Sequence, residues 1–255
     1  MLILLSPAKT MDFEADSARS KSSKPLMADD ARVLNLLLRE LSAEELGKLM
    51  KLSPKLAALN LDRNQEWVAN PPRSRARQSL QAFQGAVFAA LDAGSFSSSD
   101  WDYSQQHLAI LSGLYGVLRP LDLMMPYRLE MGTRLTNPHG ANLYQYWGER
   151  IADQVEQLVA KQGDEVIINL ASKEYFKAVD HEQIQSKVIE LQFKERKGDA
   201  FKTIGVHAKH ARGLMARYIL LEQLDHPEQL KSFTDEGYEF NQGLSQPAQL
   251  VFTRG

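Results

Sequence analysis

The 255-residue sequence contains no cysteine. That absence excludes disulfides, thiolate nucleophiles, zinc ribbons and cysteine-bound iron–sulfur clusters. The sequence also lacks any apolar run of about 18 residues, the length that a membrane-spanning helix needs. The apolar run at residues 2–5 is too short for a signal peptide, and no basic segment precedes it. We therefore expect a cytoplasmic protein with no membrane association.

A strong excess of charge is missing as well, because 30 Lys and Arg residues face 32 Asp and Glu residues, for a formal net charge of −2. Proteins that bind nucleic acid without sequence preference are usually basic overall, so any such contact must come from a local basic cluster. The apolar fraction of 44% and charged fraction of 24% are ordinary for a folded globular protein. With no linker or repeat in the chain, we expect one domain over residues 1–255.

Familiar catalytic motifs are also absent. The sequence has no GxSxG, GxxxxGK[ST], GxGxxG or HExxH pattern, so hydrolase, P-loop, Rossmann and zincin mechanisms lose their usual support. The histidines are scattered, and no carboxylate stands at matching spacing beside the closest pair. We therefore expect no metal site and no cofactor. The six histidines are His107, His139, His181, His207, His210 and His226.

The hydrophobic periodicity predicts alternating helices and strands. Apolar residues at helical spacing predict helices over residues 29–41, 42–50, 53–67, 74–91, 100–111, 142–161 and 208–224. Short apolar or alternating runs predict strands at 2–5, 165–172, 187–193 and 201–207, and a terminal strand pair near 238–243 and 249–254. Together they predict a mixed α/β fold, in which a central mixed sheet is surrounded by helices and an N-terminal helical region.

Polar and basic side chains follow the ends of several predicted strands. Ser6 and Lys9 follow the first strand, and Ser172, Lys173 and Lys177 follow the strand near 165–172. Ligands of open α/β sheets bind beyond the carboxyl ends of strands, so these residues are candidates to hold a phosphate. Lys209 and Arg212 share one helical face near another strand end. A solvated basic face, or for Ser172 a helix cap, is the alternative for each cluster.

Residues 111–132 read LSGLYGVLRPLDLMMPYRLEMG and combine three glycines and two prolines with arginines. Arg119 and Arg128 lie in this block and Arg134 follows it. Because guanidinium groups bind phosphate or carboxylate bidentately, we expect a binding loop. The alternative is a structural loop whose arginines pair with Asp122 and Glu130.

Residues 42–66 predict two helices joined by a short turn. Residues 49–57 match the helix-hairpin-helix pattern h-x-G-h-G-x-x-x-A in register, with Lys51 and Ser53 in place of the two glycines. In such hairpins the amides at a helix N-terminus contact backbone phosphates. Ser53 adds a hydroxyl here, and Lys51 and Lys55 add charge. The alternative is a helical hairpin that packs its leucines into the core.

The sequence resembles the YaaA peroxide-stress family over nearly its whole length, most clearly in five segments: LILLSPAKTMDF, HLAILSGLYGVLRPLDLMMPYRLEMG, LYQYWGERI, VIINLASKEYFKAV and AKHARGLMARYI. The resemblance implies a bacterial cytosolic protein that protects against hydrogen peroxide by limiting unincorporated iron. It also implies DNA binding through a helix-hairpin-helix and a positively charged cleft on an unusual α/β fold. The hairpin corresponds to Lys51, Leu52, Ser53, Pro54, Lys55 and Ala57. No catalytic residues are implied.

Three functions compete at this point. The favoured one is a non-enzymatic, DNA-binding stress protein. The second is an enzyme that acts on a phosphorylated or anionic small molecule at the strand ends, where neighbouring cations make a lysine a base or nucleophile. The third, direct iron handling, needs clustered carboxylate and histidine ligands and is not favoured. The expected DNA- or phosphate-binding residues are Lys51, Ser53, Lys55, Lys9, Arg119, Arg128, Arg134, Lys173, Lys177, Lys209 and Arg212.

Overall fold

A computed structural model describes residues 1–14, 21–163, 165–179 and 182–255. An eight-stranded sheet runs in the order β4-β3-β1-β6-β7-β10-β9, with β8 paired to β7. The mixed α/β fold predicted from the sequence is thus confirmed. The strands of this sheet are β1 (Leu2–Leu5), β3 (Leu108–Ser112), β4 (Gly116–Leu118), β6 (Val166–Asn169), β7 (Lys187–Lys197), β8 (Ala200–Lys202), β9 (Glu239–Phe240) and β10 (Gln249–Arg254). A second, two-stranded sheet pairs β2 (Arg77–Gln78) with β5 (Leu123–Met124).

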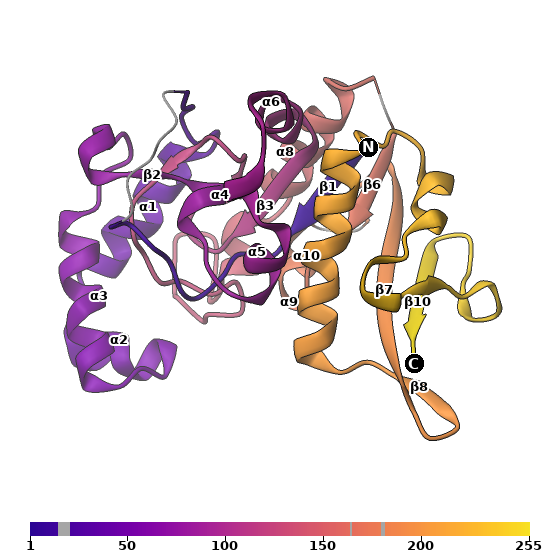
Figure 1. Ribbon diagram of the computed structural model, residues 1–255. Coiled ribbons are helices and arrows are strands. Elements are labelled where there is room, and N and C mark those ends of the chain that lie inside the picture. The colour runs from indigo at the N-terminus through magenta and orange to yellow at the C-terminus, as the bar shows by residue number, and fades with distance from the viewer. Residues whose placement is uncertain (15–20, 164, 180–181) are drawn as a thin grey trace.

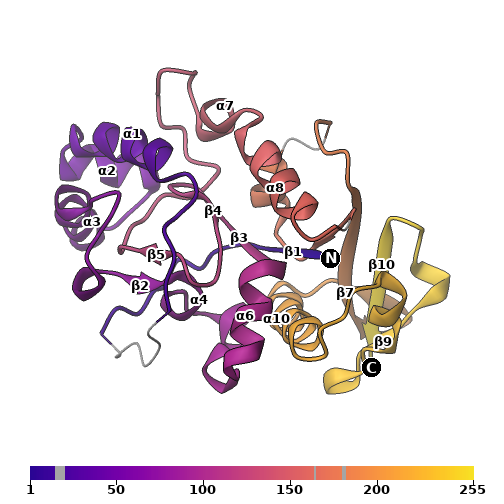
Figure 2. The ribbon, with the colours of Figure 1, turned by 90° about the horizontal axis from the view of Figure 1, so that it is seen from above.

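Five strands at the centre of the large sheet are parallel: β3, β1, β6, β7 and β10. Counted along the chain these strands are arranged 2-1-3-4-5, so the direction of winding reverses between β1 and β6. Figure 2 shows α6 (Ser98–His107) and α10 (Gly205–Leu221) on one face of the sheet and α8 (Arg150–Ala160) on the other. A reversal of this kind opens a crevice at the carboxyl ends of the two strands that flank it.

The other helices flank this sheet. The helices α1 (Ala28–Arg39), α2 (Ala43–Met50) and α3 (Pro54–Glu66) lie at one end of the molecule, opposite β7 and β10 (Figure 1). Four short helices are α4 (Ser79–Ala82), α5 (Ala86–Leu91), α7 (Leu143–Trp147) and α9 (Lys173–Phe176). Six 3-10 turns are Arg73–Arg75, Ala93–Ser95, Lys177–Val179, Pro227–Ser232, Asp235–Gly237 and Gln242–Leu244. Among the described residues, no helix has the length and apolar character needed to cross a bilayer.

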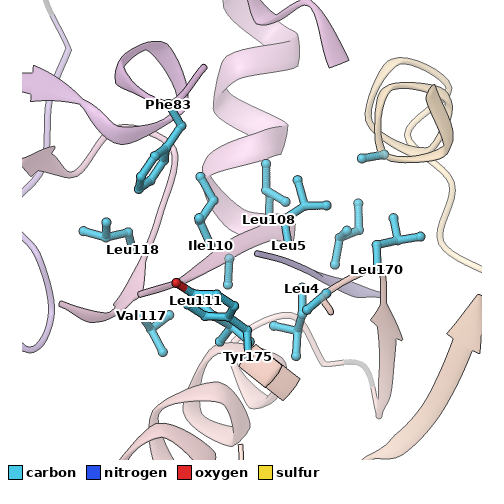
Figure 3. Close-up of a cluster of buried hydrophobic side chains, with 14 of the residues drawn as sticks. Leu4, Leu5, Phe83, Leu108, Ile110, Leu111, Val117, Leu118, Leu170 and Tyr175 are labelled. Carbon is cyan, nitrogen blue, oxygen red and sulfur yellow. The ribbon is translucent and has the colours of Figure 1, made fainter. Parts of the chain in front are cut away.

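The core is centred on β1 and β3, every residue of which is buried. Figure 3 shows Leu4, Leu5, Ile110 and Leu111 packed together, with Tyr175 against the same cluster. Burial of one such aliphatic side chain stabilises the fold by about 1.5–3 kcal/mol. Because helices cover both faces, β1 is apolar at every position, as expected for an inner parallel strand.

The predicted starts of α2 and α3 are confirmed. Ser42 Oγ accepts a hydrogen bond from Glu45 N at 3.3 Å, and Glu45 Oε2 accepts one from Ser42 N at 2.8 Å. These two bonds form a capping box at the start of α2. Pro54 occupies the first turn of α3, where its missing N–H costs nothing. The helix predicted from residue 29 begins one residue earlier, at Ala28, so that Asp29 and Asp30 fall in its first turn and do not cap it.

Four other predicted boundaries are wrong. The helix predicted over 74–91 is split into a 3-10 turn, β2, α4 and α5, because Arg77 and Gln78 pair with β5. The helix predicted through residue 111 ends at His107, and the apolar run after it is β3. The helix predicted over 142–161 is split at Gly148, where φ is +49° and ψ is −128°. The strand predicted over 201–207 ends at Lys202, and residues 205–207 begin α10.

Candidate anion-binding cleft

A cavity of about 490 Å³ lies at the carboxyl ends of β1 and β6. Its position is the point at which the strand order reverses, as expected for a ligand site of an open α/β sheet. We call this cavity the cleft. The lining residues are 6–10, 84–88 and 127–130, together with Leu170, Ser172, Glu174, Tyr175, Lys209 and Arg212.

Two serines line the cleft where β1 and β6 end. The main-chain N–H of Ser172 donates to Ser6 Oγ at 2.8 Å, and Ser6 Oγ donates to Ser172 Oγ at 3.2 Å. Ser172 Oγ also accepts from Tyr175 N at 3.5 Å, so the predicted helix cap is confirmed. These bonds tie the ends of two neighbouring strands together and present hydroxyl groups to the cleft.

One wall of the cleft comes from α10 and α5. A Cβ atom added to Gly213 would stand 2.1 Å from the carbonyl oxygen of Val87, so the two helices pack backbone against backbone there. That contact sets the position of Arg212, the preceding residue. Arg212 Nε is buried and has no hydrogen-bond partner among the described residues. Burial lowers the pKa of Arg212, and the nearby carboxylate of Glu190 opposes the shift; the guanidinium nevertheless stays charged.

The opposite wall is the segment 127–130 together with Lys9. Glu130 bridges two cations there, since it lies 2.7 Å from Lys9 Nζ and 3.3 Å from Arg128 Nη2. Arg128 Nε is buried and has no hydrogen-bond partner among the described residues. Burial lowers the pKa of Arg63 on α3, and the charge of Arg128 lowers it further. The guanidinium groups of Arg63 and Arg128 are therefore close enough to repel each other.

The formal charge of the cleft lining is positive. Lys9, Arg128, Lys209 and Arg212 outnumber the two acidic residues, Glu130 and Glu174, which gives a formal net charge of +2. Glu130 is held by Lys9 and Arg128, and Glu174 Oε1 accepts a hydrogen bond from the main-chain N–H of Gly132 at 2.9 Å. A lining with this balance attracts anions.

Buried tyrosines support the segment 127–130 from behind. Tyr127 Oη and Ser112 Oγ share a hydrogen bond of 2.7 Å. Tyr115 Oη accepts from Trp67 Nε1 at 2.7 Å and from Met125 N at 3.0 Å. Burial raises the pKa of both tyrosines, so both are neutral at ordinary pH. These contacts give the block 111–132 a structural role beside its contribution of Arg128.

The cleft brings together four of the eleven residues expected to bind phosphate: Lys9, Arg128, Lys209 and Arg212. The other four outside the hairpin are elsewhere. Arg119 Nη2 lies 2.9 Å from Asp122 Oδ1, and Asp122 is fully buried. This ion pair is the one expected if the loop is structural. Lys173 and Arg134 are exposed, and Lys177 Nζ lies over the ring of Tyr144 at 4.8 Å. The sequence analysis missed Arg63, because nothing in the spacing along α3 indicates that it approaches Arg128.

The remaining three residues lie at the hairpin between α2 and α3, which we call the hairpin. Lys51, Ser53 and Lys55 are exposed there and do not line the cleft. Lys51 has φ +54° and ψ +51°, the left-handed conformation that favours glycine. Ser53 Oγ accepts from Leu56 N at 3.4 Å, and Pro54 has no N–H. The turn thus forms without its glycines, but fewer of its amides remain for a phosphate.

Histidines and carboxylates do not gather into a metal site in the described part of the chain, where no group of three or more such side chains is suitably placed. His210 Nε2 lies 2.7 Å from Glu236 Oε1, and His207 Nδ1 lies 3.5 Å from Glu195 Oε1. His107 stacks on Tyr103 with ring centroids 3.9 Å apart. His181 lies outside the described residues.

Comparison with known families agrees with the sequence motifs. A family model described as "Peroxide stress protein YaaA" matches residues 1–244. The match spans every residue that lines the cleft and the whole hairpin. The chain therefore belongs to the YaaA family of peroxide stress proteins.

Proposed function

We propose that this protein acts in the cytoplasm during peroxide stress by binding DNA phosphates at the cleft, with the hairpin as a second contact. The observation that carries the proposal is the convergence of Lys9, Arg128, Lys209 and Arg212, from three separate segments of the chain, on one cavity. Because the chain as a whole is slightly acidic, this local excess of positive charge is what supports an interaction with a polyanion.

A line of basic residues connects the hairpin with the cleft. Lys55 and Arg63 are eight residues apart on α3, which is about 12 Å along the helix axis. Arg63 in turn lies near Arg128 in the cleft wall. We infer that Lys51, Lys55, Arg63 and Arg128 act together as one strip, which we call the basic strip. A strip of this length supports contact with several phosphates of one DNA molecule.

Phosphate binding also suggests how the protein limits damage from unincorporated iron. DNA carries a layer of condensed cations, and a protein that neutralises phosphates releases them. Ferrous ions in that layer would generate oxidising radicals from peroxide directly at the DNA. In our proposal, occupancy of the phosphates by the basic strip displaces such ions and covers the strand.

DNA binding is tested by fluorescence anisotropy of a labelled duplex over about 50–200 mM salt. If phosphate contacts dominate, the affinity falls steeply, with a logarithmic slope of about −0.9 per phosphate contacted. The variant Arg128→Ala/Lys209→Ala should bind more weakly. Lys161→Ala/Lys197→Ala, which removes two exposed lysines outside the basic strip and the cleft, is the matched control and should bind as the parent does. No salt-dependent binding to duplex or branched DNA would rule the proposal out.

An enzyme that acts on a phosphorylated or anionic small molecule is the second candidate. The observation that favours it is the cavity itself, because about 490 Å³ falls in the range of small-molecule sites, about 300–1,000 Å³. A screen of nucleotides and sugar phosphates for turnover, monitored by phosphate release and mass change, tests this candidate. Turnover of one of these compounds that Arg212→Met abolishes would support an enzymatic function. If no compound is changed, an enzyme acting on nucleotides or sugar phosphates is excluded.

A further inference from the structure

We propose that the inner part of the cleft, around Arg212, Ser6 and Ser172, binds the phosphate of a nucleoside monophosphate as a free small molecule. This inference goes beyond DNA binding, because it requires no polynucleotide. It rests on a partly buried arginine whose Nε–H lacks an acceptor among the described residues, and on a hydroxyl group with a proton to donate. It also rests on the place of the cleft in the sheet, and on the charge and volume of the lining.

Arg212 differs from most arginines of this protein. Arg119, Arg150 and Arg254 each have a carboxylate oxygen within 2.7–3.1 Å. Arg212 has no carboxylate within ion-pair distance among the described residues, although its Nε is buried, and Glu190 acts on it only from farther away. Holding the Nε–H of Arg212 out of water without an acceptor is unfavourable. A bound phosphate would supply the missing charge and acceptors in a bidentate geometry.

The hydroxyl groups add donors at the same place. Ser172 Oγ accepts two hydrogen bonds, from Ser6 Oγ and from Tyr175 N. Its own proton therefore remains for a ligand, among the contacts of the described residues. Lys209 precedes Arg212 by three residues on α10, so the two cations lie on one helix face and both line the cleft. One phosphate can accept from a hydroxyl, an ammonium and a guanidinium group together.

The fold holds these groups in place before a ligand arrives. Ser6 and Ser172 are joined across the carboxyl ends of β1 and β6, and α10 is fixed against α5 at Gly213. The strand order reverses between β1 and β6, which is where open α/β sheets bind phosphorylated ligands. A site whose donors are already positioned loses little entropy on binding.

The rest of the lining selects the class of ligand. A formal charge of +2 matches one phosphate monoester, which carries about −1.5 to −2 at neutral pH, better than a triphosphate. Phe88, Leu129 and Leu170 supply an apolar surface beside the charged groups. The volume of about 490 Å³ suits a ligand of drug-like size. A single phosphate joined to a flat, largely uncharged base has these properties.

Isothermal titration calorimetry and thermal shift with adenosine 5′-monophosphate test the inference. We expect saturable binding and a rise in Tm beyond that caused by sodium chloride of equal ionic strength. Adenosine and inorganic phosphate, each tested alone, should bind at least tenfold more weakly. Arg212→Met should weaken binding of the monophosphate at least tenfold and leave the Tm of the free protein unchanged or higher, because it removes a buried N–H that lacks an acceptor.

Arg217→Met is the matched control on the same helix. Arg217 Nη1 donates to Leu91 O at 3.0 Å, to Asp92 O at 3.1 Å and to Ser95 Oγ at 2.8 Å, so this arginine has structural partners. Its replacement should lower the Tm of the free protein and leave the affinity for the monophosphate unchanged. A purely structural role for Arg212 would instead make the two variants behave alike, which would overturn the inference.

The source of the nucleotide is resolved by a competition experiment. Labelled adenosine 5′-monophosphate is displaced either by the unlabelled compound or by an oligonucleotide with a 5′-phosphate. The inference is supported if only the free compound displaces the label, or if the free compound does so at a lower concentration than the oligonucleotide. Tighter displacement by the oligonucleotide assigns the site to DNA ends and overturns it. If no monophosphate binds while duplex DNA does, the inference fails and the proposed function stands. If the monophosphate binds while duplex DNA does not, the inference stands and the proposed function fails.

Discussion

The hairpin and the cleft both carry positive charge, yet they hold it differently. Lys51 and Lys55 are exposed and fully hydrated at a turn. Arg128 and Arg212 line a cavity, and the Nε atom of each is buried without a hydrogen-bond partner among the described residues. A hydrated lysine gains little from one ion pair, typically under about 1 kcal/mol. An arginine whose Nε–H is buried without an acceptor gains more, because an anion also removes the cost of that unsatisfied donor.

The hairpin and the cleft also differ in how closely their backbones are packed. The glycine of the hairpin helix, Gly47, has room for a side chain, since an added Cβ would lie 3.6 Å from Ala57 Cβ. Gly213 beside the cleft has none, because its Cβ would lie 2.1 Å from Val87 O. The hairpin therefore tolerates change, whereas the cleft depends on close packing between α5 and α10. The comparison teaches that the cleft is the selective, preorganised site and the hairpin is an accessory contact.

Replacement of these two glycines should produce the largest contrast. Gly213→Ala forces α5 and α10 apart and should cost about 3 kcal/mol of unfolding free energy. Gly47→Ala introduces an ordinary contact within α2 and should be neutral or stabilising by up to about 1 kcal/mol. Urea denaturation followed by circular dichroism measures both. Equal stability of the two variants would show that the packing at Gly213 does not maintain the cleft.

The hairpin should contribute less to DNA affinity than the cleft. Arg128→Ala/Lys209→Ala should weaken duplex binding by about 2–3 kcal/mol, because it removes two cations of the cleft, one of them partly buried. Lys51→Ala/Lys55→Ala should cost about 1 kcal/mol and reduce the logarithmic salt slope by up to about 2, because each lysine that binds a phosphate adds about one unit to that slope. Anisotropy titrations at two salt concentrations measure both quantities. A larger effect from the hairpin pair would reverse the ranking.

Alkaline pH should affect the cleft region rather than the hairpin. Burial raises the pKa of Tyr115 and Tyr127 above the usual value near 10. Both are neutral in the fold, so their contribution to stability is complete below about pH 10 and is lost as the pH rises further. The Tm should fall as the pH rises above about 10, and Tyr127→Phe should make that fall shallower. An unchanged pH profile in this variant would mean that Tyr127 ionises as freely in the fold as in the unfolded chain.

The smallest effect should come from Lys51→Gly, which separates the shape of the hairpin from its charge. A lysine in the left-handed region costs about 1 kcal/mol relative to glycine, so the variant should be more stable by about that amount. It also restores one glycine of the hairpin pattern while removing one cation. We expect slightly weaker DNA binding together with a higher Tm. Tighter DNA binding would show that amide geometry, and not lysine charge, governs this contact.

The parts of the fold that the sequence predicted are those set by local chemistry. The strands β1 and β6 have continuous apolar runs. The start of α2 follows from Ser42 and Glu45, and the start of α3 follows from Ser53 and the proline after it. The strand β3 was missed because its short apolar run directly follows a helical pattern, and periodicity alone does not distinguish the two. The split at Gly148 was missed because one glycine is tolerated in many helices.

The part of the site that could be predicted consists of residues at strand ends, which the sheet topology brings together. Ser6, Ser172 and Lys9 were expected near a ligand because carboxyl ends of parallel strands meet at one edge, and all three line the cleft. Ion pairing is a tertiary property, so the sequence did not distinguish Arg119, which pairs with buried Asp122, from Arg212, which lacks such a partner among the described residues. The proximity of Arg63 to Arg128 depends on how α3 packs, which no local pattern encodes.

A crystal structure of the protein with adenosine 5′-monophosphate tests most directly whether the cleft is the selective anion site. The account predicts phosphate density beside the Arg212 guanidinium and the Ser172 hydroxyl, with the base against Phe88 and no ordered nucleotide at Lys51 or Lys55. Density for the nucleotide at the hairpin, with an empty cleft, would contradict it.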